Sequence, residues 1–356
     1  MAVHGGDSIA GVALRWTPLI RATDRFTMAV PIDVSTGPGG PGPEAGLPVA
    51  TKDIVGRSLG QIAWLRLRRD KVAMGGGIIV VILILIAIIG PHVVQNPDIY
   101  HAALIDPTYL RPIGSFGGIS LAHPLGVEPE TGRDVLARIV VGAQYSLLIA
   151  FLATALAVTI GTFFGVIAGY FGGWVDAIIA RAMDVFLAFP LLVFALALAG
   201  VIPSTAFGLS GNSLRIAVLI FVIGFFNWPY MGRIIRGQTL SLREREFIDA
   251  ARSLGARGPY ILFRELLPNL FAPMLVYATL LIPTNILFEA ALDYLGVGLY
   301  VPTPTWGQML SSAVTNGYYY IDPEYMLVPG IAIFITVMAF NLFGDGLRDA
   351  LDPRTR

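Results

Sequence analysis

The 356-residue sequence contains no cysteine, and this absence excludes several kinds of site at once. Disulfide scaffolds, thiolate zinc sites, iron–sulfur clusters and cysteine nucleophiles all require that side chain. Charge is scarce too: Asp, Glu, Lys and Arg make up 13% of the residues, whereas a soluble domain carries roughly 25%. The 24 basic and 24 acidic residues cancel, so no overall basic field exists to collect nucleic acid. With 55% hydrophobic residues, the composition indicates an integral membrane protein that does not bind nucleic acid.

Residues for catalysis or metal binding are also few. The four histidines show no metal-ligand spacing, and no Ser–His–Asp set is suggested (His4, His92, His101, His123). Neither of the two lysines, Lys52 and Lys71, stands in a G-x-x-x-x-G-K-[ST] phosphate-binding loop. We therefore expect no enzyme activity, no metal and no bound cofactor in this chain. If it moves a solute uphill, another subunit must hydrolyse the nucleotide.

Membrane spans are expected in stretches that lack Asp, Glu, Lys and Arg. A helix that crosses the hydrocarbon layer, which is about 30 Å thick, needs roughly 20 mainly apolar residues. Six stretches qualify: Val72 to Pro97, Ile139 to Val175, Val185 to Leu214, Ile216 to Gly232, Leu266 to Phe288, and Tyr325 to Gly344. The sequence therefore predicts an all-α, polytopic membrane protein whose six-helix domain covers residues 74–346.

The positions of the basic residues predict the orientation, because short cytoplasmic loops retain Lys and Arg. Most of them fall before residue 74, at a turn around Arg181, in Arg233 to Arg264, and after Gly344. The loop from Asp293 to Glu324 has none. Both termini, including the tail 347–356, are therefore expected in the cytoplasm.

The N-terminal region divides into two parts. Residues 1–52 include the Gly- and Pro-rich stretch 37–46 and are expected to form a disordered cytoplasmic tail. Residues 53–73 are expected to form an amphipathic helix at the inner headgroup layer, because one face is apolar and Trp64 lies beside basic residues (Leu59, Ile62, Ala63 and Leu67; Arg66, Arg68, Arg69 and Lys71).

Small and polar residues within the spans suggest packing and gating positions. Glycines recur every fourth residue along the second span and predict a close contact with another helix of the pore bundle, although glycine is common in membrane helices generally (Gly161, Gly165, Gly169). Later spans contain prolines that permit kinks (Pro190, Pro229, Pro273, Pro283). Glu289, near the end of the fifth span, is either a gating or structural group or a solvated carboxylate.

The loop at residues 237–268 carries the most informative pattern. Phe247, Ala250, Ala251 and Leu254 share one helical face. Gly255 stands where a helix end needs a left-handed residue, and the next helix opens at Gly258-Pro259. The pattern predicts a helix, a sharp turn and a second helix. The first helix either contacts a protein partner or rests on lipid headgroups.

This loop resembles the EAA loop of ABC importer permeases. The match is DAA-x3-G, eleven further residues and Leu-Pro (Asp249, Ala250, Ala251, Gly255, Leu267, Pro268), with aspartate in place of the usual glutamate. Three other segments are similar to the oligopeptide/dipeptide-type subfamily: His123 to Ala150, Gly169 to Pro190, and Glu289 to Leu310. The first has Val127-Glu128 in place of Thr-Asp and one extra residue, and the last has Asp293 where serine is common.

The resemblance implies a type I ABC importer permease fold in a bacterial plasma membrane and transport of di- or oligopeptides or a related solute. It implies four partners besides the lipid: a homologous second permease, two cytoplasmic ATPases that use ATP and Mg²⁺, and an external substrate-binding protein. The implied coupling helix would engage an ATPase through this loop (Glu246, Phe247, Asp249, Ala250, Ala251, Leu254, Gly255, Leu267, Pro268). The residues that contact solute are not indicated.

Two other classes of function remain open at this point. The chain is alternatively a freestanding channel or secondary carrier for a small solute, or a membrane anchor whose loop recruits a soluble enzyme. Co-purification separates these hypotheses, since only an importer permease requires a second membrane subunit and ATPase chains.

Overall fold

The computed structural model describes residues 59–351 except Gly200, Ile202 and Ser204. The predicted N-terminal tail, residues 53–58 of the predicted interfacial helix and residues 352–356 of the predicted C-terminal tail lie outside this part of the chain.

Helices make up most of the described chain. In order they are α1 (Leu59–Leu67), α2 (Lys71–Val93), η1 (Ala102–Leu104), α3 (Val135–Phe171), α4 (Gly173–Ala188), α5 (Leu191–Ala199), α6 (Gly211–Arg243), α7 (Glu246–Ser253), α8 (Gly258–Tyr260), η2 (Ile261–Leu266), α9 (Leu267–Tyr294), α10 (Trp306–Thr315), α11 (Tyr318–Ile321) and α12 (Pro323–Leu351). A short antiparallel hairpin, β1 (Thr205–Ala206) and β2 (Leu209–Ser210), precedes α6. Segment η2 has π-helical geometry, and α8, η2 and α9 run on as one helix.

Within the described residues, five helices are long and apolar enough to cross a membrane: α2, α3, α6, the helix at residues 258–294, and α12. The pair α4 and α5, bent by 74° at a break that contains Pro190, supplies a sixth when it is counted as one span. The predicted all-α, polytopic fold class is therefore confirmed.

The predicted third span is wrong in its position. It begins at Gly173 rather than Val185, and Arg181 lies inside α4 rather than in a turn. The reason is that α4 carries its charges in ion pairs. Asp184 accepts from Arg233 of α6 at 2.5 Å and lies 3.7 Å from Arg181. A search for charge-free stretches consequently divides this helix.

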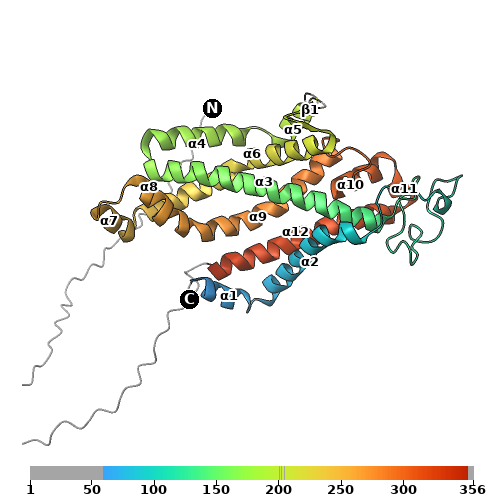
Figure 1. Ribbon diagram of the computed structural model, residues 1–356, viewed down its shortest axis with the longest axis horizontal. Coiled ribbons are helices and arrows are strands. Elements are labelled where there is room, and N and C mark those ends of the chain that lie inside the picture. The colour runs from blue at the N-terminus through green and yellow to red at the C-terminus, as the bar shows by residue number, and fades with distance from the viewer. Residues whose placement is uncertain (1–58, 200, 202, 204, 352–356) are drawn as a thin grey trace, which may run out of the picture. The chain divides into compact units, whose positions relative to one another are not determined.

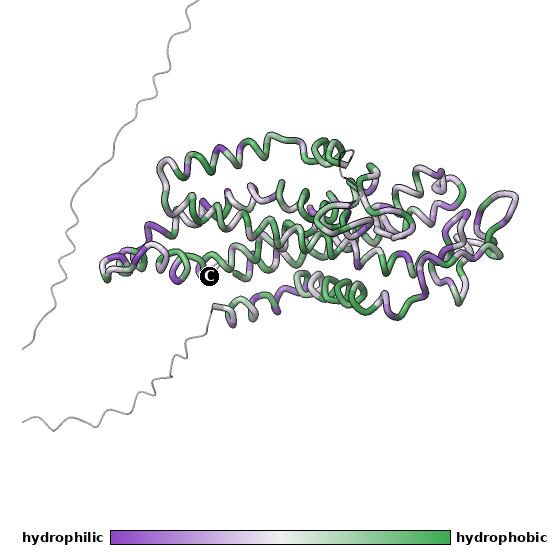
Figure 2. Tube along the Cα trace, turned by 45° about the horizontal axis from the view of Figure 1, so that its top comes forward, coloured by the Kyte–Doolittle hydropathy of each residue, from purple (hydrophilic) through white to green (hydrophobic). Residues whose placement is uncertain are grey.

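The helices pack around α3 and α9. Helix α3 lies along α6 over most of its length, and α12 packs against α2 and α9. One end of the bundle carries α1, α7 and α8, whereas the other carries the loop at residues 94–134 together with α10 and α11 (Figure 1). Hydrophobic residues fill the middle of the long helices, and hydrophilic residues gather toward both ends (Figure 2).

Candidate functional site: a coupling surface and a buried polar layer

The segment between α6 and α9 folds as helix, sharp turn and helix. Helix α7 follows Arg245, whose backbone is extended, and it carries Glu246 and Asp249 in its first turn. Carboxylates there face the positive end of the helix dipole. Gly255 ends the unit with φ of +83°, in the left-handed region that favours glycine, and its amide donates to the Arg252 carbonyl at 2.9 Å.

A single buried side chain attaches α7 to the bundle. Ile248 is fully buried and packs with Ile261 and Leu266, which belong to the first turns of the next helix. Leu242 at the end of α6 and Tyr170 at the end of α3 pack against the same cluster. The sequence analysis did not single out Ile248, because it followed only the apolar face that includes Phe247. One isoleucine thus connects α7 to three long helices.

The predicted apolar face of α7 points away from the bundle. Leu254 is 89% exposed and Phe247 is 37% exposed. Full burial of such a side chain stabilises a protein by roughly 1.5–3 kcal/mol, so α7 leaves a favourable contact unmade. The face forms one side of an open hollow of about 630 Å³. Its lining consists of Phe247, Ala250, Ala251, Leu254, Gly255, Ala256, Arg257, Tyr260 and Glu265.

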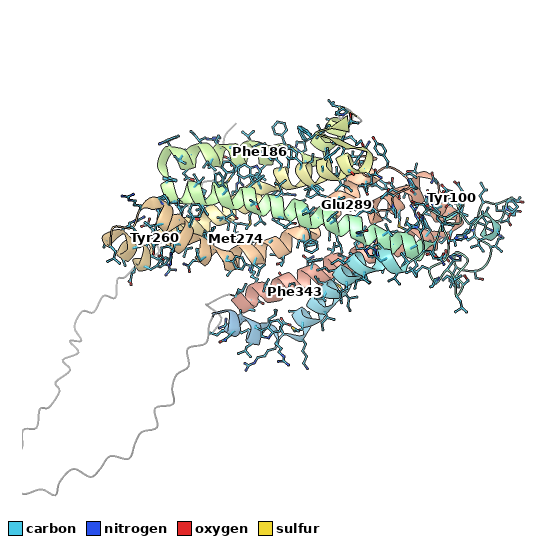
Figure 3. The ribbon with its side chains drawn as sticks, viewed as in Figure 1. Tyr100, Phe186, Tyr260, Met274, Glu289 and Phe343 are labelled. Atoms are coloured by element: carbon cyan, nitrogen blue, oxygen red, sulfur yellow. The ribbon has the colours of Figure 1, made fainter. Side chains whose placement is uncertain are left out.

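This hollow brings together five of the predicted coupling residues and adds four others. Among the additions, Tyr260 marks this end of the bundle in Figure 3, and Arg264 lies over its ring with 5.8 Å between the guanidinium carbon and the ring centroid. The other four residues that were predicted to couple do not line the hollow (Glu246, Asp249, Leu267 and Pro268). No sequence signal placed Tyr260 there, since its position depends on the turn at Gly255.

Leu267 and Pro268 instead shape the start of α9. Pro268 has no N–H to donate to the Arg264 carbonyl, and its ring crowds that oxygen. The backbone widens into the π-helical η2, in which the Leu267 amide donates to the Leu262 carbonyl. The Leu-Pro pair therefore sets the local geometry at the base of the helix that carries Ile261.

Arg243 ties the end of α6 to the end of α3. Its guanidinium donates to the carbonyl oxygens of Gly169 at 3.4 Å and Tyr170 at 3.1 Å. These carbonyls lie in the last turn of α3, where no amide of the helix follows to pair with them. Arg236, two turns earlier on α6, forms a bidentate ion pair with Asp176 of α4. The ends of α3, α4 and α6 are consequently joined next to α7.

The three predicted packing glycines lie along the contact between α3 and α6. A Cβ atom added to each would lie 2.6 Å from an atom of α6, namely Met231 Cβ, the Gly232 carbonyl oxygen and Thr239 Cβ (from Gly161, Gly165 and Gly169 respectively). Real Cβ atoms essentially never come this close to other heavy atoms. The two helices therefore approach as closely as they do because these positions lack side chains.

Glu289, labelled in Figure 3, lies inside α9 and is fully buried. The Ser146 hydroxyl of α3 donates to its Oε1 at 3.2 Å. One turn later on the same helix, Asp293 is also buried and accepts a hydrogen bond from the Thr305 hydroxyl. The alternative that Glu289 is a solvated carboxylate at a helix end is therefore wrong.

One turn before Glu289, Asn285 continues this polar face of α9. Its side-chain amide donates to the Thr154 hydroxyl of α3 at 2.8 Å, and its oxygen accepts from the Asn227 amide of α6 at 2.9 Å. All three side chains are buried. Polar groups at this depth thus link three membrane helices in one layer.

The other end of the bundle is fixed by buried charges. Arg138 of α3 is fully buried and donates to the Gln308 side chain of α10 at 3.1 Å. Burial raises the pKa of the nearby Glu128 carboxyl, but the charge of Arg138 and the hydrogen bond and charge of Arg133 outweigh it, so the pKa of Glu128 falls below its usual value. Tyr325 of α12 donates to the same carboxylate at 2.7 Å. The loop at residues 94–134 is thereby attached to α3 and α12.

Two further hollows lie beside α6 and α9, and one of them is also bordered by α4 and α5. Their volumes are about 280 and 420 Å³, and Asn227, Tyr230 and Phe288 line both of them. Tyr230 is 55% exposed, and Thr284 of α9 is exposed in the larger hollow. Polar side chains midway along two membrane helices are poorly suited to lipid contact.

Comparison with known proteins identifies the family. Residues 161–356 match the model of the binding-protein-dependent transport system inner membrane component, which covers more than half of the chain. The chain belongs to this family. Residues 58–112 also match the N-terminal transmembrane domain of oligopeptide transport permease C. The chain is therefore an ABC importer permease of the oligopeptide/dipeptide type and a multi-pass inner membrane protein.

Similar proteins extend over most of the chain. The dipeptide transport system permease protein DppC of Alkalihalophilus pseudofirmus is 39% identical over 294 residues, which cover 83% of this chain and 90% of that protein. The glutathione transport system permease protein GsiD of Escherichia coli is 39% identical over 297 residues, or 82% and 90% of the two chains. Among solved structures, the inward-facing MetNI methionine ABC transporter matches with 22% identity and a TM-score of 0.47, over 60% of this chain and 96% of that chain. The two family models and the two sequence relatives confirm the predicted family.

Proposed function

We propose that this chain is the permease subunit that carries di- or oligopeptides, or a related solute, across the bacterial plasma membrane. The names of two relatives mention a dipeptide and glutathione, and glutathione is itself a small peptide. The structural observation that carries the proposal is the exposed apolar face of α7, which is held to the bundle by Ile248.

The energy comes from ATP that binds with Mg²⁺ to two separate ATPase subunits, while this chain performs no catalysis. Each coupling contact forms when the α7 hollow accepts an apolar segment of an ATPase. A rigid-body shift of the ATPase then moves α7, and Ile248 passes that shift to the ends of α3, α6 and the helix at 258–294. The exposed Asp249–Arg252 pair, 3.2 Å apart, helps to align α7 with the ATPase and contributes little binding energy.

The proposed orientation places α7 and both termini in the cytoplasm. Helix α1 and the end of α12 lie at the same end of the bundle as α7 (Figure 1). Helix α1 then lies along the inner leaflet, and the end of α12 faces the cytoplasm. The loop at 94–134, α10 and α11 face the external substrate-binding protein.

The homologous second permease and the solute path lie against the outside of α6 and α9. The hollows there expose Tyr230 and Thr284, which suits a water-filled path or a protein partner and does not suit lipid. Glu289 lies behind this surface. We assign it to gating, through its bond to Ser146, because α3 and α9 separate at this point only if that bond breaks.

The coupling role is tested by Leu254→Asp in the assembled importer. The exposed leucine makes no packing contact that the fold needs, so the variant should insert normally and retain its stability. A buried, unpaired aspartate at the ATPase contact should lower co-purification of the ATPase subunits at least about tenfold. Leu121→Asp, a fully exposed leucine in the loop at the opposite end, is the matched control.

Two results would count against the proposal. One is unchanged ATPase recovery with Leu254→Asp, which would leave the α7 face without a partner. The other is solute accumulation by the purified chain alone in liposomes under an ion gradient, which would favour a freestanding carrier. Protease access to an N-terminal tag from the cytoplasmic side tests the orientation independently.

A further inference from the structure

A further open groove lies between α1, α2 and α12, and we call it the α2 groove. Its volume is about 500 Å³. It is lined by Trp64, Leu67, Met74, Gly77, Ile78, Val80, Val81, Ile82, Ile84 and Phe343. None of these side chains is charged, so the groove suits a hydrocarbon ligand.

The floor of the groove is rigid because α2 and α12 are in close contact there. A Cβ atom at Gly76 would lie 2.9 Å from the Ala339 carbonyl oxygen, and one at Gly77 would lie 2.9 Å from the ring of Phe343. The Phe343 side chain therefore fills the space beside Gly77; Figure 3 labels it on α12. Leu67 of α1 belongs to a hydrophobic cluster against which Phe343 packs, and it closes one end of the groove.

The length of the groove matches one leaflet. Its lining on α2 runs from Met74 to Ile84, and these ten helical steps span about 15 Å. The hydrocarbon core of a bilayer is about 30 Å thick, so each leaflet contributes about half of that depth. An acyl chain that enters at the Met74 end would therefore extend along the whole groove.

The Met74 end is surrounded by cationic side chains. Arg68, Arg69 and Lys71 are exposed, and no ion pair involves them within the described residues. The carboxylate of Asp70 lies between them but accepts hydrogen bonds from the first amides of α2. Trp64 is 57% exposed at the same end, as is typical of side chains at the membrane–water interface.

We propose that the α2 groove binds one anionic phospholipid of the inner leaflet, with an acyl chain along α2 and its phosphate among Arg68, Arg69 and Lys71. The complementary charge and the one-leaflet length favour a lipid. A partner helix fits less well, because helices in membranes associate through small and polar residues, whereas the rim consists of bulky Ile78, Val81 and Ile82. The proposal rests on the proposed orientation, since the basic end must face the cytoplasmic leaflet.

The test measures lipid retention by the purified full-length chain with native mass spectrometry. The probes are phosphatidylglycerol and phosphatidylcholine with identical acyl chains. Arg68→Gln/Arg69→Gln should lower retained phosphatidylglycerol about 30-fold, because two basic side chains next to an anionic headgroup are removed. Arg245→Gln/Arg264→Gln, which removes two exposed arginines elsewhere at this end, is the matched control and should retain the lipid.

A second variant tests the groove itself without removing any packing. Val81→Trp places a large ring in the groove from an exposed position and should expel the acyl chain, whereas Ile89→Trp, exposed on the same helix outside the groove, should not. Equal retention of the two lipids, or unchanged retention in both Val81→Trp and the double arginine variant, would overturn the proposal. Displacement by inorganic phosphate alone would show an anion site without the groove and would also overturn it.

Different results would refute the lipid proposal and the proposed orientation. If protease reaches the N-terminal tag only from outside, the orientation is wrong even where lipid retention persists. If the tag is cytoplasmic and no selective retention is found, only the lipid proposal is wrong.

Discussion

Gly165→Ala tests whether the contact between α3 and α6 depends on the missing side chain. The new Cβ would lie 2.6 Å from the Gly232 carbonyl oxygen and 2.9 Å from Ile235 Cβ. Neither atom belongs to the flexible end of a side chain, so rotation of a side chain cannot relieve the contact. The two helices must separate, and such overpacking costs about 1–3 kcal/mol.

Helix propensity acts in the opposite direction and has to be measured separately. Replacing a helical glycine with alanine stabilises a helix by up to about 1 kcal/mol. Gly237→Ala on α6 isolates this gain, because a Cβ there has no atom within 4 Å. Because both variants gain the same helix propensity, that gain cancels, and we expect Gly165→Ala to be less stable than Gly237→Ala by the packing cost alone, about 1–3 kcal/mol.

Unfolding of both variants in mild detergent, titrated with a denaturing detergent and followed by tryptophan fluorescence, measures this difference. Trp228 lies next to the contact: its carbonyl oxygen is 2.7 Å from the Cβ that would be added at Gly161, so its signal reports on this region. If Gly165→Ala and Gly237→Ala unfold at the same denaturant concentration, the close-approach argument is refuted.

Three further changes probe the turn, the polar layer and the outer loop. Proline requires a negative φ and has no amide to bond the Arg252 carbonyl, so Gly255→Pro should abolish solute uptake without loss of membrane insertion. Gly255→Ala should lose about 1–2 kcal/mol of local stability and keep part of the uptake. Asn285→Leu should cost about 1–3 kcal/mol in detergent unfolding, because it removes the hydrogen bond to Thr154 and leaves the Asn227 amide without its acceptor. Burial, and then the neighbouring Glu324, raise the pKa of Asp322 to about 7, so this group favours folding below pH 4 and that contribution is lost as the pH rises toward 7. Asp322→Asn should therefore flatten the decline in thermal stability between about pH 4 and 7.

The sequence predicted the features that depend on local pattern. Gly255 adopts the left-handed conformation expected of it, and Pro190 lies at the break between α4 and α5. The prediction of where the third span begins was wrong, because the charges of this helix are paired with a helix that follows later in the chain. Asp184 pairs with Arg233, 49 residues away, so a count of charges in one stretch misplaces the helix.

The buried polar groups required the fold before they could be understood. Glu289 finds its partner Ser146 at a distance of 143 residues, and Asn285 finds Thr154 at 131 residues. No periodicity within α9 distinguishes a carboxylate that meets a hydroxyl from one that meets water. Likewise, Ile248 attaches α7 to the bundle only because the ends of three helices meet at this side chain.

The attachment of α7 also determines which helices move together. Because α7 lies between α6 and α9 in the chain, its motion would be expected to act first on those two helices. However, Tyr170 packs in the same cluster as Ile248, and Arg243 binds the last carbonyls of α3. The glycine contact then keeps α3 against α6 along its length. Under the proposed function, we therefore expect a push on α7 to move α3 with α6 as one body. The bonds that change would then lie where α9 meets that body, at the layer that contains Asn285.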